Sequence, residues 1–367
     1  MPTRSLLATL LAAAAGAACL LAPRPAHAIP VFAHRYGLTC QTCHTAIPHL
    51  TEYGAEFLAG GYRLPEMKPR GTFPVAVKVN LQYGSEASGG LPKSVVDEIE
   101  VLTGGSIGKR GAYFAEQYVV DGGLPGRTRD LWASWRVTPD GARVPVSVRG
   151  GQFTLDLPVD PETFRETTDH YAIWDQTAGA NPFTFFAPKT GVMVGAGDQD
   201  RGLSASVAAV RGHEPGSGLP SRGVDRYVYA QHAAANVVVS AYRYDGTRSV
   251  DGTDDRFWRE GVGLSIARGR ARFDAVYQRG YDWNASANGA LVSSGAFAQL
   301  RYDLSARTFA LARYDGTQDT AFSRALIAGV GYRLARNARV TVFDTIHRDA
   351  DTGVRRNSLS TALLFAY

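Results

Sequence analysis

The feature that most constrains the fold is an alternation of apolar and polar residues that begins at Phe73. From Phe73 to Tyr83 every second residue is apolar, and Ala76, Lys78, Asn80 and Gln82 lie on the other face. This period of two is typical of a β-strand with two different faces. Eleven residues is the length that a tilted strand needs to cross a bilayer, and the aromatic ends match interfacial girdles. The stretch therefore predicts a membrane-crossing strand.

The same pattern recurs, less regularly, to the end of the chain. The further segments are residues 95–103, 111–121, 129–138, 143–153, 189–197, 202–211, 224–232, 235–243, 256–266, 270–280, 290–303, 305–315, 324–333, 337–347 and 357–367. With the first, they make sixteen strands. An even number suits a single-chain bacterial barrel, because both termini then lie on the periplasmic side. No later segment approaches the ~18 apolar residues of a spanning helix, so a closed barrel is the remaining way across a membrane.

The lengths of the links between these segments also alternate. Links after even strands are mostly short, and links after odd strands are mostly longer. The short links include 139–142, 198–201, 233–234 and 267–269, and the longer ones include 84–94, 154–188, 212–223, 244–255, 281–289 and 348–356. Outer-membrane barrels have short periplasmic turns and long external loops, whereas a soluble β-sandwich or lipocalin-like barrel has no reason for this asymmetry. We therefore expect an all-β outer-membrane barrel of about sixteen antiparallel strands over residues 73–367.

Residues 1–28 are typical of a secretory signal peptide. Arg4 gives a positive start, Leu6 to Ala22 is almost wholly apolar, and Ala26-His27-Ala28 offers a small-x-small cleavage site. A lipoprotein site at Cys19 is an alternative that leaves residues 26–28 without a role. Removing Arg4 and Arg24, with no acids, lowers the formal charge from +5 to +3, which indicates no nucleic-acid partner.

Between the signal and the barrel, residues 29–72 hold the motif Cys40-Gln41-Thr42-Cys43-His44. Cys-x-x-Cys-His is the attachment signature of c-type haem, in which two thiols bond to the haem and the histidine binds the iron. A thioredoxin-like pair would sit near a βαβ pattern, and a structural disulfide gives no reason for His44. Zinc needs four ligands, and the only other cysteine is Cys19 in the signal. We expect one covalent haem c at Cys40 and Cys43, with His44 as proximal ligand.

The distal ligand of the haem iron has three candidates. Met67 is the only methionine of the mature chain outside a predicted strand, and a thioether ligand would give a fairly high potential. His34 and His49 are the imidazole alternatives, and either would make a bis-histidine haem. All three could equally be ordinary residues, Met67 filling a gap and the histidines solvated in loops.

The third external loop, Thr154 to Pro188, is long enough to suggest a function. In porin-like barrels the corresponding loop often folds inward. Glu162, Glu166, Asp169, His170 and Asp175 could hold a cation transiently, or could simply be solvated. Asp251, Asp254 and Asp255 of another loop could attract cations from outside, although turn chemistry explains them equally well.

The residues around the haem motif resemble those of one known family. The matching residues are Ile29-Pro30-Val31-Phe32-Ala33, Gly37, Cys40-x-x-Cys43-His44, Ile47-Pro48-x-Leu50, Gly54, Phe57 and Gly61-Tyr62. Over this stretch the chain resembles the monohaem cytochrome–porin fusions of iron-oxidising bacteria, and the order of haem segment and barrel extends the resemblance. It departs at His34-Arg35-Tyr36, where the family more often has Arg, a variable residue and Thr.

The resemblance implies an electron-transfer protein of the outer membrane. Such a protein takes electrons from dissolved Fe(II) or another extracellular one-electron donor and passes them to a periplasmic c-type cytochrome. Since the apolar band of a barrel is ~25 Å tall, a haem wholly on one side would leave most of that distance uncrossed, so we expect the haem segment in or against the lumen. Two alternatives are a transport pore with a haem gate or redox sensor, and a periplasm-facing haem module tethered to the barrel.

Overall fold

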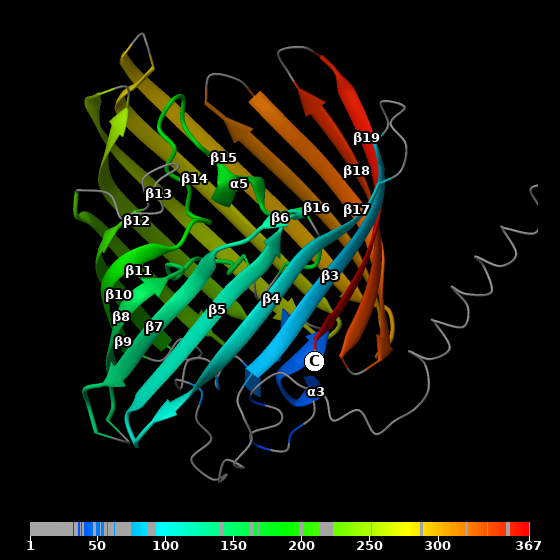
Figure 1. Ribbon diagram of the computed structural model, residues 1–367, viewed down its shortest axis with the longest axis horizontal. Coiled ribbons are helices and arrows are strands. Elements are labelled where there is room, and N and C mark those ends of the chain that lie inside the picture. Colours follow the sequence, from blue (N-terminus) through cyan, green and yellow to red (C-terminus); the bar gives the residue numbers. More distant parts are fainter. Residues whose placement is uncertain are drawn as a thin grey trace, which may run out of the picture.

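The computed structural model is a closed antiparallel barrel with a small segment at one end (Figure 1). It describes residues 32, 36, 38, 40–46, 49–51, 53–54, 57, 62 and 75–366, the last range without 87–92, 140–141, 162–164, 168, 198–201, 213–222, 251, 287–288, 320–321, 336 and 350–352. Within these residues no helix is both long and apolar enough to span a membrane.

Sixteen long strands form the barrel wall in the described part of the chain. They are β3 (Val75–Glu86), β4 (Lys93–Ile107), β5 (Gly111–Asp121), β7 (Thr128–Arg136), β8 (Val146–Phe153), β9 (Lys189–Gly197), β10 (Gly202–Arg211), β11 (Asp225–Ala234), β12 (Val237–Val250), β13 (Thr253–Arg268), β14 (Ala271–Ser286), β15 (Gly289–Asp303), β16 (Thr308–Gln318), β17 (Phe322–Ala335), β18 (Ala338–Asp349) and β19 (Arg355–Ala366). Each neighbours the next, and β19 pairs with β3 to close the ring, Leu363 lying opposite Leu81. The two-residue β6 (Leu124–Pro125) pairs only with the end of β5. Each of the sixteen predicted segments overlaps one of these strands, so the predicted fold class is confirmed.

The two ends of the barrel differ in their links. One end, here the turn end, holds the start of β3, the end of β19 and links such as 235–236 and 269–270. The opposite end, the loop end, holds the segment Thr154–Pro188 between β8 and β9. Short turns and the chain ends lie on the periplasmic side of outer-membrane barrels.

Two of the predicted long links are wrong. Residues 244–255 and 281–289 belong mostly to strands, because β12 and β13 pair as far as Val250 and Thr253, and β14 and β15 as far as Ser286 and Gly289. The ladder of backbone hydrogen bonds continues beyond the length needed to cross a bilayer, so polar residues near the loop end are strand residues rather than loop residues.

The outward face of the barrel is apolar. On β10, Leu203 and Val207 are 70% and 52% exposed, while Ser204 and Ser206 between them are buried inside. A soluble barrel would have the reverse arrangement, because its large apolar side chains would be withdrawn from water. This face is therefore suited to the hydrocarbon core of a bilayer.

The amino-terminal segment lies at the turn end of the barrel (Figure 1). It contains α3 (Cys40–Cys43), β1 (His44–Ala46) and β2 (His49–Leu50), and β1 and β2 pair as a small antiparallel sheet.

Candidate functional site

The Cys-x-x-Cys-His motif forms one short helix and the start of a strand. Backbone N–H of Thr51 donates to the Cys43 carbonyl at 2.8 Å, and the Thr51 hydroxyl donates to the Thr42 carbonyl at 2.8 Å. These bonds satisfy carbonyls that a helix end leaves without partners. A side chain at Gly54 would collide with the Cys43 carbonyl, so glycine is needed where the chain returns past the motif. The motif is therefore held by the residues that follow it.

The thiol of Cys43 is half-buried and is not part of a disulfide. Burial raises the pKa of the Cys43 thiol, so the residue is a poor nucleophile until it is activated. The side chains of Cys40, His44 and His49 lie outside the described part of the structure, as do residues His34 and Met67. The predicted haem ligands therefore stay predictions.

Four aromatic residues of the same segment pack together. The rings of Phe32 and Tyr62 stack with centroids 4.4 Å apart, and Phe57 meets Phe32 and Tyr36 edge-on at 5.0 and 5.8 Å. The Tyr36 hydroxyl donates to the Tyr62 carbonyl at 3.2 Å. Tyr62 has φ of 60°, a left-handed conformation that is unusual for a bulky residue and is commonest at functional positions.

This aromatic group packs against the inner wall of the barrel. Tyr62 stacks on Trp132 of β7, with centroids 5.9 Å apart and planes 20° apart, and lies 5.7 Å from the ring of Phe114 on β5. Phe32 lies so close to Gly104 of β4 that a methyl group at Gly104 would be only 2.9 Å from its Cζ. Leu131 and Trp135, the outward neighbours of Trp132, are exposed, so these contacts lie on the lumen side. The described aromatics of the segment thus lie against the lumen wall, as the sequence predicted.

The residues present suit a haem. The group consists of aromatic and apolar side chains, with Leu38 packed against it, and Leu38 stands two residues before the helix Cys40–Cys43 in sequence. Tyr62 is only 7% exposed in this group, and this burial raises the pKa of its hydroxyl. A flat, largely apolar macrocycle attached at Cys40 and Cys43 would meet the apolar surroundings that haem sites use to control solvent access and potential.

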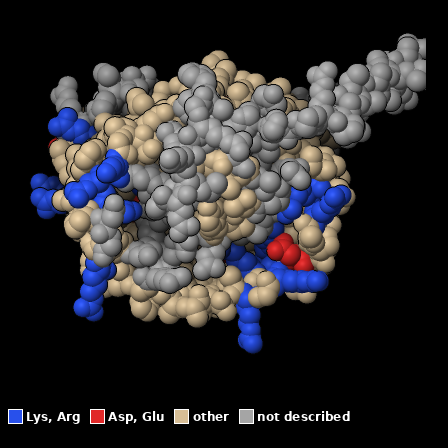
Figure 2. Space-filling view, turned by 90° about the horizontal axis from the view of Figure 1, so that it is seen from below, with Lys and Arg blue, Asp and Glu red and all other residues tan. Residues whose placement is uncertain are grey.

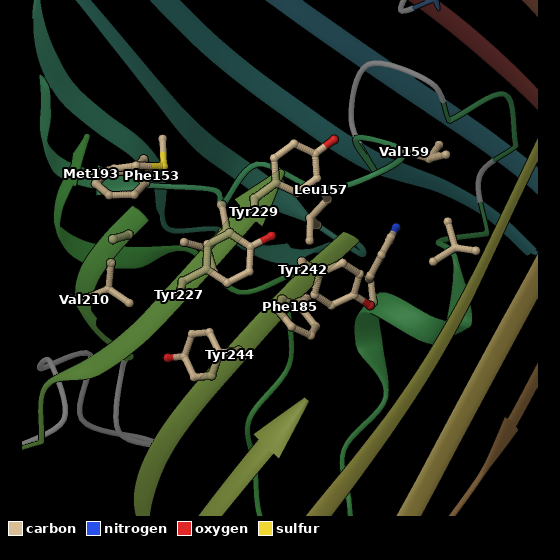
Figure 3. Packing of buried hydrophobic residues seen from close by; sticks show 14 of the residues in the cluster. Phe153, Leu157, Val159, Phe185, Met193, Val210, Tyr227, Tyr229, Tyr242 and Tyr244 are labelled. Carbon is tan, nitrogen blue, oxygen red and sulfur yellow. The ribbon is translucent and has the colours of Figure 1, made fainter. Parts of the chain in front are cut away.

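The predicted long loop Thr154–Pro188 folds into the lumen. Its apolar residues, among them α5 (Ala172–Asp175) with the buried Trp174, pack on aromatic side chains from the wall. The rings of Trp174 and Tyr242 lie 5.9 Å apart. Phe185 lies 5.2 Å from the ring of Tyr242 (Figure 3). Tyr171 stacks on Phe297 at 4.5 Å. The loop is therefore a packed part of the barrel interior.

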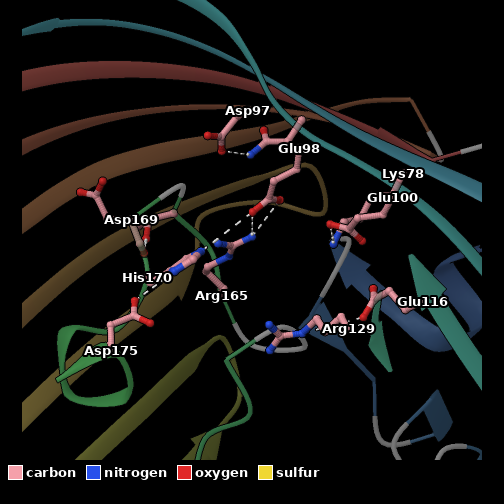
Figure 4. Close-up of polar contacts among 12 residues, drawn as sticks. Lys78, Asp97, Glu98, Glu100, Glu116, Arg129, Arg165, Asp169, His170 and Asp175 are labelled. Carbon is pink, nitrogen blue, oxygen red and sulfur yellow. Dashed lines mark hydrogen bonds and ion pairs between the residues drawn. The ribbon is translucent and has the colours of Figure 1, made fainter. Parts of the chain in front are cut away.

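Ion pairs and hydrogen bonds tie the loop to strands around the barrel. Arg165 donates twice to Glu98 of β4, at 2.7 and 2.9 Å (Figure 4). Glu166 accepts from Arg301 and from Arg339, the latter at 2.6 Å. Arg313 donates to the carbonyl of His170 at 2.8 Å.

The cation-binding role expected for the loop acids has no support in the described structure. Glu166 is neutralised by two arginines, Asp169 accepts from Thr345 at 3.0 Å, and His170 pairs with Asp175 at 3.0 Å. Asp255 accepts from Asn181 at 2.7 Å, while Asp251 and Glu162 lie outside the described residues. Among the described residues no three His, Cys, Asp or Glu side chains form a group that could hold a metal ion. Glu166, Asp169, Asp175 and Asp255 therefore have structural partners in the described part of the chain.

The sequence interpretation missed the arginines that bind the loop. Arg301, Arg313 and Arg339 are buried at inward positions of three strands. That these arginines face the lumen could have been predicted from the sequence. In an alternating strand one face is apolar, so a charged residue on the polar face must point into the lumen. What the pattern left open was which acid or carbonyl each arginine would meet.

With an apolar outward face, a closed ring of sixteen strands and a loop folded into the lumen, the chain has the fold of bacterial outer-membrane porins, and its location is the outer membrane, as predicted. One similar structure is the anion-selective porin of Comamonas acidovorans, with a TM-score of 0.62 and 10% identity over 80% of this chain and 98% of that one. Another is the outer-membrane channel DcaP of Acinetobacter baumannii, with a TM-score of 0.59 and 10% identity over 80% of this chain and 96% of that one. A third is Salmonella typhi OmpF in complex with daunomycin, with a TM-score of 0.59 and 13% identity over 80% of this chain and 97% of that one. No protein-family model and no curated protein matches the chain.

Proposed function

We propose that the protein is an electron conduit of the outer membrane, in which one c-type haem bound to Cys40, Cys43 and His44 accepts electrons from an extracellular donor and delivers them to a periplasmic cytochrome. The observation that carries the proposal is the position of the motif. Cys43 of its helix lies against Gly54, and Phe57, three residues further on, belongs to the aromatic group that stacks on Trp132 inside the barrel. A redox centre there would lie within an insulating wall rather than beside the membrane.

The residues of the chain supply attachment, burial and position. Cys40 and Cys43 would attach the group, His44 would ligate its iron, and the Thr51 bonds to the helix would hold the motif in place. When bound, the haem supplies a one-electron couple whose potential depends on its ligands and burial. Phe32, Tyr62 and Trp132 would keep water from it.

The nature of the donor and acceptor rests on the resemblance to cytochrome–porin fusions. Fe(II) is the donor that this resemblance implies, and a periplasmic c-type cytochrome is the acceptor. Because the motif lies at the turn end, which is the periplasmic end in porins, the acceptor would need to approach only that end.

A solute pore is the second candidate, and the fold favours it more directly. The similar structures include an anion-selective porin and an outer-membrane channel. In this chain two segments enter the lumen, the inward loop and the amino-terminal segment, so the amino-terminal segment would act as a gate. Ion conductance of the purified barrel in a planar bilayer would support this function, and a barrel that conducts no ions would argue against it.

The deciding experiment is a visible spectrum of intact cells that carry the oxidised protein, before and after Fe(II) is added outside. We expect reduced-haem bands to appear at once in the wild type and never in Cys40→Ala cells. If the wild-type haem is reduced only after the outer membrane is permeabilised, the conduit proposal is wrong and the periplasm-facing module replaces it. If the purified protein carries no haem, the solute pore is the remaining proposed function.

A further inference from the structure

Three arginines form a row near the loop end of the barrel, on the neighbouring strands β17, β18 and β19 (Figure 1). Arg324 of β17 lies opposite Arg348 of β18, and Arg348 lies opposite Arg355 of β19. All three side chains are exposed, and we call these residues the arginine row. Directly opposite residues on one face of an antiparallel pair have Cβ atoms about 4.5–5.5 Å apart. The row therefore brings three positive charges together.

The arginine row faces outward and borders the apolar band of the barrel. Side chains an even number of residues apart share a face of a strand. The exposed apolar residues that share the face of the row are Leu326, Val342 and Leu359, and the buried residues beside them are Ile327, Phe343 and Ser360. Outer-membrane barrels hold their loop end toward the outside of the cell, so the row lies at the height of the outer-leaflet headgroups.

The arginine row has no counter-charge in the described part of the chain. None of its three guanidinium groups makes a hydrogen bond or an ion pair with a described residue. One outward acid is described on these strands, Asp344, which is four residues from Arg348. At about 3.3 Å a residue it lies about 13 Å away along the strand, which is too far for an ion pair.

The chain beside the row adds little negative charge to it. Asp319, which precedes β17, accepts a hydrogen bond from the Gly179 backbone at 3.3 Å, so its carboxylate is turned toward the lumen loop. Position 349, occupied by Asp349, belongs to the inward series of β18 by alternation. Asp351 lies outside the described residues, and it is a single carboxylate beside three guanidinium groups.

A second outward row shows how the chain itself can neutralise charge in this geometry. Arg243 of β12, Glu260 of β13 and Arg279 of β14 also lie opposite one another. Glu260 pairs with Arg243 at 2.9 Å and with Arg279 at 2.8 Å. Like charges directly opposite one another destabilise a sheet, whereas opposite charges stabilise it. In the arginine row the central position holds Arg348 instead of an acid, so the balancing charge must come from a ligand.

The number of basic residues does not distinguish this site from the rest of the barrel. Figure 2 shows lysines and arginines around the turn end. The loop end has further exposed arginines, among them Arg211, Arg226 and Arg256. The arginine row differs from them because its three guanidinium groups are adjacent, lie in register and have no partner among the described residues.

We infer that the arginine row binds the headgroup of an outer-leaflet lipid that carries two or more phosphate groups. A guanidinium group binds phosphate through two parallel N–H donors, and three such groups in a line match several phosphate oxygens of one ligand. The acyl chains of this lipid would lie along the adjoining apolar band, beside the exposed Leu326 and Leu359. A soluble phosphate would use the arginines without this band, so the band favours a lipid.

The test uses the full-length protein in micelles of a neutral detergent, with lipid A that carries two phosphate groups as the probe. Native mass spectrometry measures how much lipid is bound as the probe is titrated. Each basic residue near an anionic headgroup strengthens binding by about fivefold. We therefore expect the apparent affinity to fall about tenfold or more in the triple variant Arg324→Gln, Arg348→Gln, Arg355→Gln.

The matched control replaces three other outward arginines near the loop end, Arg226, Arg243 and Arg279, with glutamine. It removes the same charge and should bind lipid A like the wild type. Heat-dependent mobility on a gel shows whether each triple variant is folded. If the row variant does not fold, Arg348→Gln removes only the central charge and should weaken binding about fivefold.

Three outcomes would overturn the inference. Equal binding of lipid A by the wild type and the row variant would show that the row does not hold it. An equal loss of binding in both triple variants would show that overall charge attracts the lipid. Displacement of lipid A by an equimolar amount of inorganic pyrophosphate would show that the ligand is a soluble anion. The measurement needs no haem and can be repeated with Cys40→Ala, so an absent haem spectrum with intact lipid binding would count against the proposed function alone.

Discussion

Two segments lie inside this barrel, and they are held in different ways. The loop Thr154–Pro188 is bonded to strands around the wall, through Arg165 to β4, Glu166 to β15 and β18, and Arg313 of β16. The amino-terminal segment, in its described residues, meets only one side of the wall, where Phe32 and Tyr62 pack on β4, β5 and β7. The loop is therefore bonded to the barrel as part of one structure, whereas the described residues of the segment are packed against one side of it.

We expect the loop contacts to stabilise the barrel and the amino-terminal segment to carry the proposed function. A buried ion pair is costly to break, so the loop contacts fix the shape of the lumen. Aromatic stacking is worth only about 0.5–1.5 kcal/mol a pair beyond area burial, so the wall contacts made by the described residues of the segment are individually weaker. The predicted haem-binding residues lie on this segment, and the variants below test whether barrel stability and haem attachment can be separated.

The largest effect is expected from Cys40→Ala with Cys43→Ala. All covalently bound haem should be lost, while the barrel, whose strands include neither residue, should fold unchanged. The haem spectrum of the purified protein measures the first effect, and heat-dependent mobility on a gel measures the second. A variant that kept its haem through denaturation would refute the attachment, and loss of the folded barrel would show that segment and scaffold are one unit.

Next in size is Glu166→Gln. It leaves Arg301 and Arg339, 5% and 6% exposed in their side chains, without their shared carboxylate. Breaking a buried pair costs about 3–5 kcal/mol, so the denaturant midpoint should fall clearly. The control is Glu260→Gln, since Glu260 also pairs with two arginines, Arg243 and Arg279, but is 32% exposed on the outward face and makes no described contact with the loop. Equal shifts in both variants would show that the loop is not an anchor.

Trp132→Leu should loosen the docked segment without unfolding the barrel. It removes the ring on which Tyr62 stacks, and Trp135→Leu, on the same strand but outward and 51% exposed, is its matched control. We expect trypsin to cleave after Arg63 or Arg70 about tenfold faster in Trp132→Leu, which corresponds to about 1.4 kcal/mol of lost docking free energy. If both variants were cleaved at the wild-type rate, the wall contact would not hold the segment.

The strands could be predicted from the sequence and most contacts inside the barrel could not. Alternation over Phe73–Tyr83 fixes which residues face lipid, because one face must be apolar along the whole strand. Glu166, by contrast, looked like a cation ligand because its partners Arg301 and Arg339 are 135 and 173 residues away in sequence. The same holds for Tyr62, whose partner Trp132 is on another element. Pattern determines the face of a residue, but tertiary packing determines its partner.

The smallest effect concerns His170 of the loop, which lies 3.0 Å from Asp175 and 3.9 Å from Glu98. Burial and Arg165 lower the pKa of His170, but the hydrogen bond to the Asp175 carboxylate and the nearby Glu98 carboxylate raise it by more, so the net shift is upward. A raised folded pKa means that protonated His170 stabilises the loop fully below its unfolded pKa of about 6.5, and that this contribution is lost as pH rises through the folded value. The melting temperature of wild type minus that of His170→Gln should therefore decrease between pH 5.5 and pH 9. Because Asp175 is 41% exposed, added salt should reduce the difference at low pH. A difference that is constant with pH would show that His170 is neutral in the folded protein, and that the loop depends on its arginines alone.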